Sequence, residues 1–111
     1  MKISKKTAQN FWKEQYGERK IVKDFNGSYM YYDAYGNRNY SRIINGEKVF
    51  CGWNIHHVNP KSNGGKNTKG NLVCTNIITN DAAGNKTTYW IDRNKYQVRK
   101  NGKDSYRVYK L

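Results

Sequence analysis

Short turn signals divide this chain into segments too brief for long helices. Asn-Gly pairs stand at 26–27, 45–46 and 101–102, and a Tyr-Gly-Asn turn stands at 35–37. Asn and Gly suit tight hairpin turns, because both accept the positive backbone φ angles that such turns need. Aromatic and β-branched residues alternate with polar ones between these turns, which is typical of strands. We therefore expect short strands joined by hairpins over 20–50 and again over 89–111.

One segment near the N-terminus predicts a helix instead. Ser4 suits the capping position of a helix over 5–16, and Gly17 suits its end. Four residues fall near one face of this helix: Ala8, Phe11, Trp12 and Gln15. We expect that face to pack on a sheet.

The length of 111 residues suits a single α+β domain over 1–111. We expect the N-terminal helix and β-hairpins over 1–50, a central core over 51–86, and a basic C-terminal β-hairpin or meander over 87–111.

The charge points to a polyanionic partner. The chain has 21 Lys and Arg against 8 Asp and Glu, which gives a formal net charge of +13. Basic residues and stackable aromatic residues are interleaved, which favours nucleic acid. No apolar run approaches the roughly 20 residues that span a bilayer, and no apolar signal core follows the basic residues at 1–6. We expect no membrane partner and an intracellular, cytoplasmic location.

The two cysteines, Cys51 and Cys74, are too few for a disulfide framework or a four-cysteine zinc site. We expect them to be small buried residues and expect no structural zinc.

The central segment reads as strand, loop, strand and helix. A strand over 53–58 contains the adjacent pair His56 and His57, and a polar loop follows over 59–70. A second strand over 71–74 leads to a helix over 75–83 that ends at Gly84. Adjacent residues of a strand point to opposite faces, so the two imidazoles take different positions. Pro60 helps to end the first strand.

This arrangement suits phosphodiester hydrolysis, which needs a base for water and a divalent cation for the phosphate oxygens. One histidine can bind the cation while its neighbour reaches the water. Asn80 is a candidate second ligand, because Asn is an indifferent choice in the middle of a helix. Asp81 and Asn85 compete for that role. Two protein ligands leave positions for water and phosphate, which suits Mg²⁺ or Mn²⁺, and a transition metal could substitute through the imidazole.

The ordered set of residues resembles the HNH, or ββα-metal, endonuclease family. The resemblance covers about a third of the chain and lies in these residues: His56, His57, Pro60, Gly64, Gly65, Asn71, Leu72 and Asn80. It implies that His56 and Asn80 bind the metal and that His57 is the general base. It also implies that Asn71 pins the loop and orients the base.

Two departures from the family pattern stand out. The chain has no Cys-x-x-Cys pair, and Ala83 stands where the family has a lysine three residues after the final ligand. Lys86 or another basic residue would then serve the phosphate.

The resemblance implies a DNA substrate, double-stranded, cut by a small phage-encoded or homing-type protein acting as a monomer or homodimer. A monomer with one such site should nick. We expect these residues to contact the nucleic acid: Lys61, Lys66, Lys69, Lys86, Arg93, Lys95 and Arg99. The alternative is a non-catalytic module of the same fold that binds nucleic acid or protein, such as a phage inhibitor of a host defence nuclease.

Overall fold

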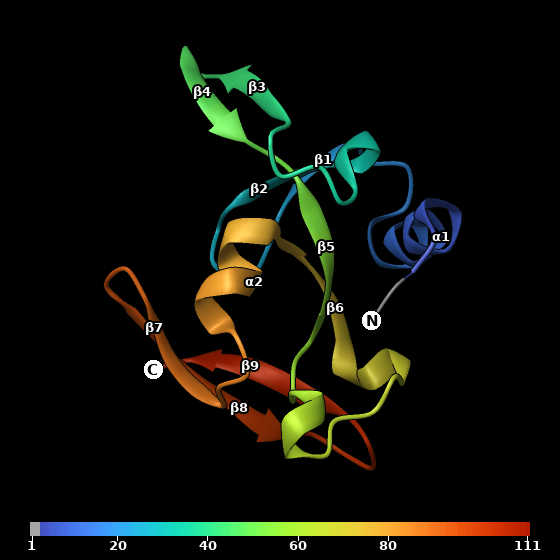
Figure 1. The fold of residues 1–111 in the computed structure, drawn as a ribbon, viewed down its shortest axis with the longest axis vertical. Helices are drawn as coiled ribbons and strands as arrows, with labels where there is room; N and C mark the ends of the chain where they lie inside the picture. Colours follow the sequence, from blue (N-terminus) through green and yellow to red (C-terminus); the bar gives the residue numbers. More distant parts are fainter. Residues whose placement is uncertain (1–2) are drawn as a thin grey trace. The chain divides into compact units, whose positions relative to one another are not determined.

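The computed structural model describes residues 3–111 and has α+β architecture, as expected (Figure 1). Met1 and Lys2, which open the basic N-terminal segment, lie outside the described residues. The helices are α1 (Lys5–Tyr16) and α2 (Ile77–Ala83). The strands are β1 (Ile21–Lys23), β2 (Tyr29–Tyr31), β3 (Ser41–Ile44), β4 (Glu47–Phe50), β5 (Trp53–His57), β6 (Leu72–Asn76), β7 (Thr88–Ile91), β8 (Asn94–Lys100) and β9 (Tyr106–Lys110). Short 3-10 helices occupy Tyr32–Ala34, Lys61–Asn63 and Lys69–Asn71.

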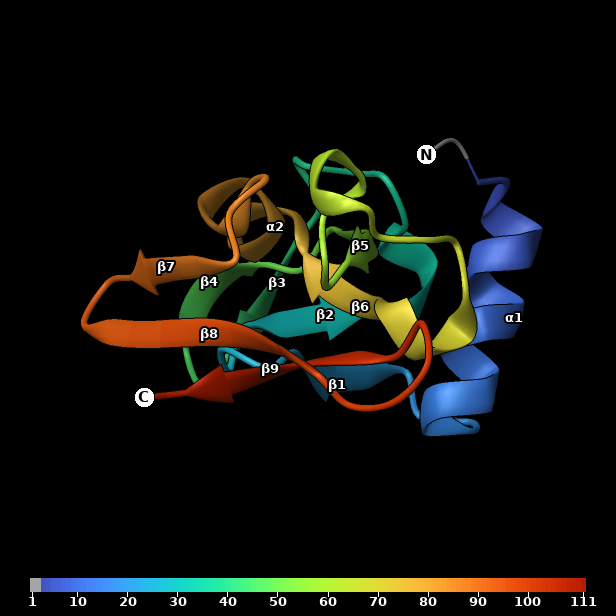
Figure 2. The same cartoon turned by 90° about the horizontal axis from the view of Figure 1, so that it is seen from below.

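The strands form small sheets of neighbours in sequence. β1 pairs with β2, β3 with β4, and β5 with β6, while β7, β8 and β9 form a three-stranded antiparallel meander (Figure 2). The turn between β3 and β4 has positive φ at both Asn45 (51°) and Gly46 (81°), the geometry of a type I′ hairpin turn. The turn pairs of the sequence therefore mark hairpins as predicted.

The described chain divides into two compact units. Unit 1 comprises the residues up to Asn54 together with Cys74–Ile77, and unit 2 comprises Ile55–Val73 and Ile78–Leu111. β5 and β6 each contribute residues to both units. The expected single domain over 1–111 stays a prediction. In the part of the chain that the structure describes, no helix is long and apolar enough to cross a membrane.

The interior of unit 1 is built around two tryptophans. Trp12 of α1 and Trp53 of β5 are fully buried, and their ring centroids lie 4.9 Å apart. Each indole N–H donates to a backbone oxygen, of Arg19 and of Tyr32 respectively. Ser4 caps α1 as predicted, and its side chain accepts a hydrogen bond from the backbone N–H of Thr7.

Burial agrees with most of the sequence-based expectations. Cys51 and Cys74 are free and buried, which confirms them as interior residues. Gln15, in contrast, is exposed. Ile77, at the start of α2, is buried, whereas the next residue, Ile78, is 56% exposed. A helix as short as α2 has a narrow buried face, and two consecutive residues cannot both lie on it.

The interior of unit 2 lies on one face of the meander. Tyr89 and Ile91 of β7 and Tyr96 of β8 are buried, and Tyr89 is directly opposite Tyr96 in the register. Because residues alternate across a strand, the intervening residues face outward.

Candidate functional site

The histidine pair stands at the end of β5, and its two side chains contact different elements. His56 is 5% exposed and lies against α2, where its Nδ1 is 2.6 Å from Asn80 Oδ1. His57 is half-buried, and its Nε2 lies 2.5 Å from Oδ1 of Asn67 in the following loop. The alternation predicted from strand geometry is therefore observed.

Burial favours the neutral form of His56. Removal from water lowers the pKa of this imidazole, the neighbouring His57 adds to that effect, and the contact with Asn80 opposes it. Its Nε2 is buried and has no hydrogen-bond partner among the described residues. Because Asn80 Oδ1 can only accept, a neutral His56 carries its proton on Nδ1 and its lone pair on Nε2. Neutral imidazole nitrogens and amide oxygens are both groups that divalent metals accept as ligands.

Of the three candidates for the second ligand, Asn80 is the one whose oxygen contacts His56. It occupies the middle of α2 and is half-buried. Asp81 is exposed on the same helix, and Asn85 is exposed beyond its end. Ala83, at the family's lysine position, is fully buried, and Lys86 is exposed.

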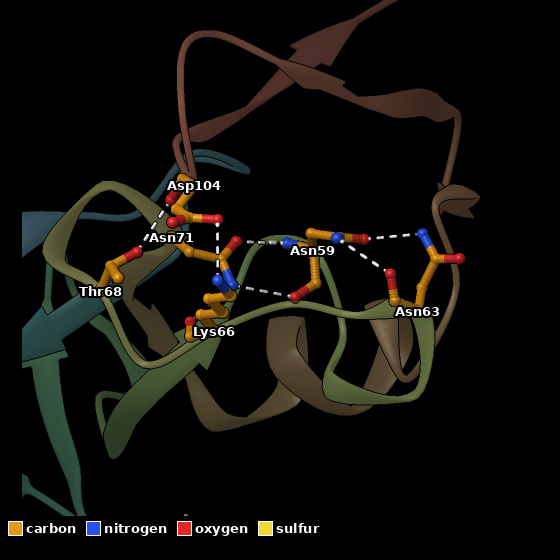
Figure 3. Close-up of polar contacts among 6 residues, drawn as sticks. All are labelled: Asn59, Asn63, Lys66, Thr68, Asn71 and Asp104. Carbon is orange, nitrogen blue, oxygen red and sulfur yellow. Dashed lines mark hydrogen bonds and ion pairs between the residues drawn. The ribbon is translucent and has the colours of Figure 1, made fainter.

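Asn71 pins the loop that follows β5 (Figure 3). Its side chain is fully buried; its Oδ1 accepts from the Asn59 N–H at 2.7 Å, and its Nδ2 donates to the carbonyls of Asn59 (3.0 Å) and Lys66 (2.9 Å). The Asn59 amide in turn exchanges hydrogen bonds with Asn63. Both N–H donors and the carbonyl oxygen of the Asn71 amide thus bind the loop backbone.

The Gly-Gly pair of this loop has two separate conformational roles. Gly64 has a φ of 84°, in the left-handed region. A Cβ at Gly65 would overlap the carbonyl oxygen of Asn59 and stand 2.9 Å from Asn71 Nδ2. Gly65 therefore allows the close approach on which the Asn71 hydrogen bonds depend.

A second set of contacts ties the loop to the turn between β8 and β9 (Figure 3). Thr68 Oγ1 donates to the Asp104 carbonyl at 2.8 Å, and Lys66 Nζ lies 3.6 Å from the Asp104 carboxylate. The Ser105 hydroxyl donates to the Gly70 carbonyl at 3.4 Å. Lys66 is largely exposed and Asp104 is half-buried, and ion pairs this close to the surface add little stability.

All eleven site residues predicted from the sequence belong to unit 2. Of the seven residues expected to contact phosphate, Lys95 is half-buried. The other six are exposed: Lys61, Lys66, Lys69, Lys86, Arg93 and Arg99. Their assignment to nucleic acid stays a prediction.

The sequence reasoning missed Asn67 and Asp104. Both lie in segments without periodicity, and each acquires its partner through the folded loop, so no local pattern distinguishes them. Asn67 was one of many polar residues in the loop over 59–70.

Comparison with protein-family models, with curated proteins and with solved structures finds no match to this chain.

Among residues 3–111, no group of three or more His, Cys, Asp or Glu could hold a metal ion. The candidate site differs from such a group, because it consists of one imidazole, of His56, and one amide oxygen, of Asn80. Burial raises the pKa of the Cys74 thiol to about 12, which opposes the thiolate form that metals bind.

Proposed function

We propose that this protein is a metal-dependent endonuclease of the HNH type that hydrolyses phosphodiester bonds in DNA. One observation carries the proposal. His56 Nδ1 on β5 lies 2.6 Å from Asn80 Oδ1 on α2, although the two residues are 24 positions apart in the chain. His57, the next residue of β5, contacts Asn67 instead. An imidazole paired with an amide oxygen beside a second imidazole suits metal-assisted hydrolysis.

His56 and Asn80 would hold a divalent cation, with Mg²⁺ or Mn²⁺ the best match to a site of few protein ligands. The cation would supply charge neutralisation at the phosphate oxygens and at the leaving oxygen. The neutral state of His56, which its burial favours, is the state in which an imidazole can be a ligand.

The general base in this proposal is His57, and its contact with Asn67 selects the reacting nitrogen. Asn67 Oδ1 is an acceptor, so the proton of a neutral His57 sits on Nε2 and the lone pair on Nδ1. Nδ1 then takes the proton from the attacking water. The resulting imidazolium keeps its Nε2 hydrogen bond, and Asn67 therefore stabilises the charge that forms.

Charge and location support nucleic acid as the substrate. The net charge of +13 favours a polyanion, and the seven basic residues expected at phosphates share unit 2 with the histidines. The Asn71 network holds the loop backbone between the histidine strand and these lysines.

A plasmid-nicking assay tests the proposal directly. We expect wild-type protein to convert supercoiled plasmid to the nicked form with Mg²⁺ or Mn²⁺ and to stop when EDTA is added. We expect His57→Ala to lower the rate on the order of 100- to 10,000-fold, the usual contribution of a general base. Asn80→Ala should need more metal for the same rate.

Asn85→Ala is the matched control for Asn80→Ala, because Asn85 is an exposed asparagine just beyond the same helix. It should nick like the wild type. Equal rates for wild type and His57→Ala, or nicking that persists in EDTA, would overturn the proposal. Tight DNA binding without any nicking would favour the non-catalytic binding module.

A further inference from the structure

The outward face of the C-terminal meander combines exposed aromatic rings with positive charge. Trp90 is 63% exposed and Tyr109 is 37% exposed, on the face opposite the buried Tyr89, Ile91 and Tyr96. The register pairs on this face are Trp90 with Lys95, Gln97 with Tyr109, and Arg99 with Arg107. No residue of β7, β8 or β9 is acidic.

Each exposed ring has a cation beside it. Lys95 Nζ lies 5.8 Å from the Trp90 centroid, and the Arg99 guanidinium lies 5.2 Å from that of Tyr109. Arg99 is also held by a 2.8 Å hydrogen bond from its Nε to Gln97.

We infer that this face binds unpaired nucleotides of single-stranded DNA, with bases stacked on Trp90 and Tyr109 and phosphates held by Lys95, Arg99 and Arg107. Aromatic rings on a basic sheet are a general platform for unpaired bases, because every base has a π-face. The choice of DNA rests on the proposed function; the stacking itself does not.

The spacing of the two rings favours splayed bases over a duplex. Trp90 and Tyr109 lie on the outer strands of the meander and one register row apart, which corresponds to about 12 Å. Stacked bases of one duplex strand are about 3.4 Å apart, and their faces are covered by their neighbours. The two rings therefore suit bases of an extended single strand.

The face belongs to the same unit as the candidate catalytic residues. The β8–β9 turn contacts the loop over 59–71 through Asp104 and Thr68. A DNA strand bound on the meander would therefore be bound by the same unit that contains His56 and His57. We expect the preferred substrate to be DNA with an unpaired stretch.

Tryptophan fluorescence gives a direct test, because Trp90 is exposed while Trp12 and Trp53 are fully buried. In EDTA, we expect a short oligothymidylate to quench the emission of Trp90, and Trp90→Tyr to abolish the quenching while retaining most of the affinity. Heparin, which offers charge without bases, should bind with little quenching. Equal quenching by heparin and oligothymidylate would overturn the inference.

Affinities measured by anisotropy of a labelled oligothymidylate complete the test. Trp90→Ala and Tyr109→Ala should each weaken binding roughly 5- to 150-fold, the usual effect of losing one stacked base. Both should leave the affinity for a duplex of the same length within about twofold. Phe50→Ala is the matched control, since Phe50 is an exposed aromatic residue (42%) beside Lys48 in unit 1.

Unchanged oligothymidylate affinity in both variants, or an equal loss for the duplex, would refute the stacking. Tighter binding of the matching RNA would refute the choice of DNA. Trp90→Leu, which retains an apolar side chain at this exposed position, repeats the measurement if Trp90→Ala fails to fold. Because binding is measured without metal, a protein that stacks DNA but never nicks would disprove the nuclease and leave this inference standing.

Discussion

Two adjacent histidines acquire different environments because a strand directs neighbouring side chains to opposite faces. His56 is buried against Asn80, and His57 is half-buried against Asn67. The first environment favours a neutral imidazole, which the proposed function uses as a ligand, and the second orients the imidazole that it uses as a base. One dipeptide can therefore supply two functions at the residue scale.

The lowered pKa of His56 predicts how stability depends on pH. Burial disfavours the charged imidazole in the folded state, so the unfolded chain binds the proton more readily as the pH falls below about 6.5. The free energy of unfolding should therefore decrease as the pH falls through that value, until it passes the lowered folded-state pKa. Urea unfolding in EDTA at about pH 7.5 and pH 5 measures this.

The chain has two histidines, which gives this experiment its control. His56→Asn should remove most of the pH dependence in this window. His57→Asn removes only the smaller contribution of His57 to the lowered pKa of His56 and should retain most of it. The same slope in wild type and His56→Asn would show that burial of His56 does not set the effect.

Asn67 is predicted to matter through the tautomer of His57. Asn67→Ala removes the acceptor for Nε2–H, so we expect kcat for plasmid nicking to fall about 10-fold, a fraction of what the base itself contributes. KM should change little, because Asn67 acts on the base.

Asn10→Ala, at an exposed position of α1 in unit 1, is the control for Asn67→Ala and should behave like the wild type. A kcat unchanged in Asn67→Ala, or a loss that falls on KM instead, would remove Asn67 from the site.

At the scale of elements, hydrogen bonds from its own side chains hold the backbone of the loop after β5. Asn71 binds the backbone at Asn59 and Lys66, and Thr68 binds the β8–β9 turn. A polar loop with few apolar residues can hold one conformation when buried side-chain amides satisfy its backbone groups.

The two glycines of this loop should respond differently to alanine. Gly64→Ala introduces a Cβ at positive φ, with no atom within 4 Å of it, so the expected cost is about 1 to 2 kcal/mol. Gly65→Ala places a Cβ on the Asn59 carbonyl and should cost more, because backbone cannot move aside. Urea unfolding of both variants tests this order, and a smaller loss for Gly65→Ala would contradict it.

At the scale of the whole molecule, the two features that matter are the net positive charge and the division of the chain into two units. The net charge of +13 repels itself and is balanced when a polyanion binds. The residues predicted for catalysis, metal binding and phosphate contacts all belong to unit 2. Unit 1 contains the paired buried tryptophans.

Duplex DNA affinity should therefore depend steeply on salt. If four to five phosphates are contacted, the logarithm of the association constant should fall with a slope of about −4 against the logarithm of salt concentration. Lys61→Gln and Lys69→Gln should each reduce that slope by about one. Lys48→Gln removes the same charge from β4 in unit 1 and should leave the slope unchanged. A flat salt dependence would argue against phosphate contacts.

The sequence by itself determined the elements whose causes are local. The cap at Ser4 and the stop at Gly17 define α1, and the Asn-Gly pair at 45–46 defines a hairpin, because capping and positive φ depend on the residues themselves. The opposite orientation of His56 and His57 likewise follows from the geometry of a strand.

Only the tertiary structure decided which residues meet. It brought Asn80 rather than Asp81 or Asn85 to His56, and it placed Asn67 beside His57. It also left Ile78 exposed. These outcomes depend on which face of a short helix is buried and on how an aperiodic loop closes. Contacts between residues distant in the chain set both, and no local sequence pattern encodes them.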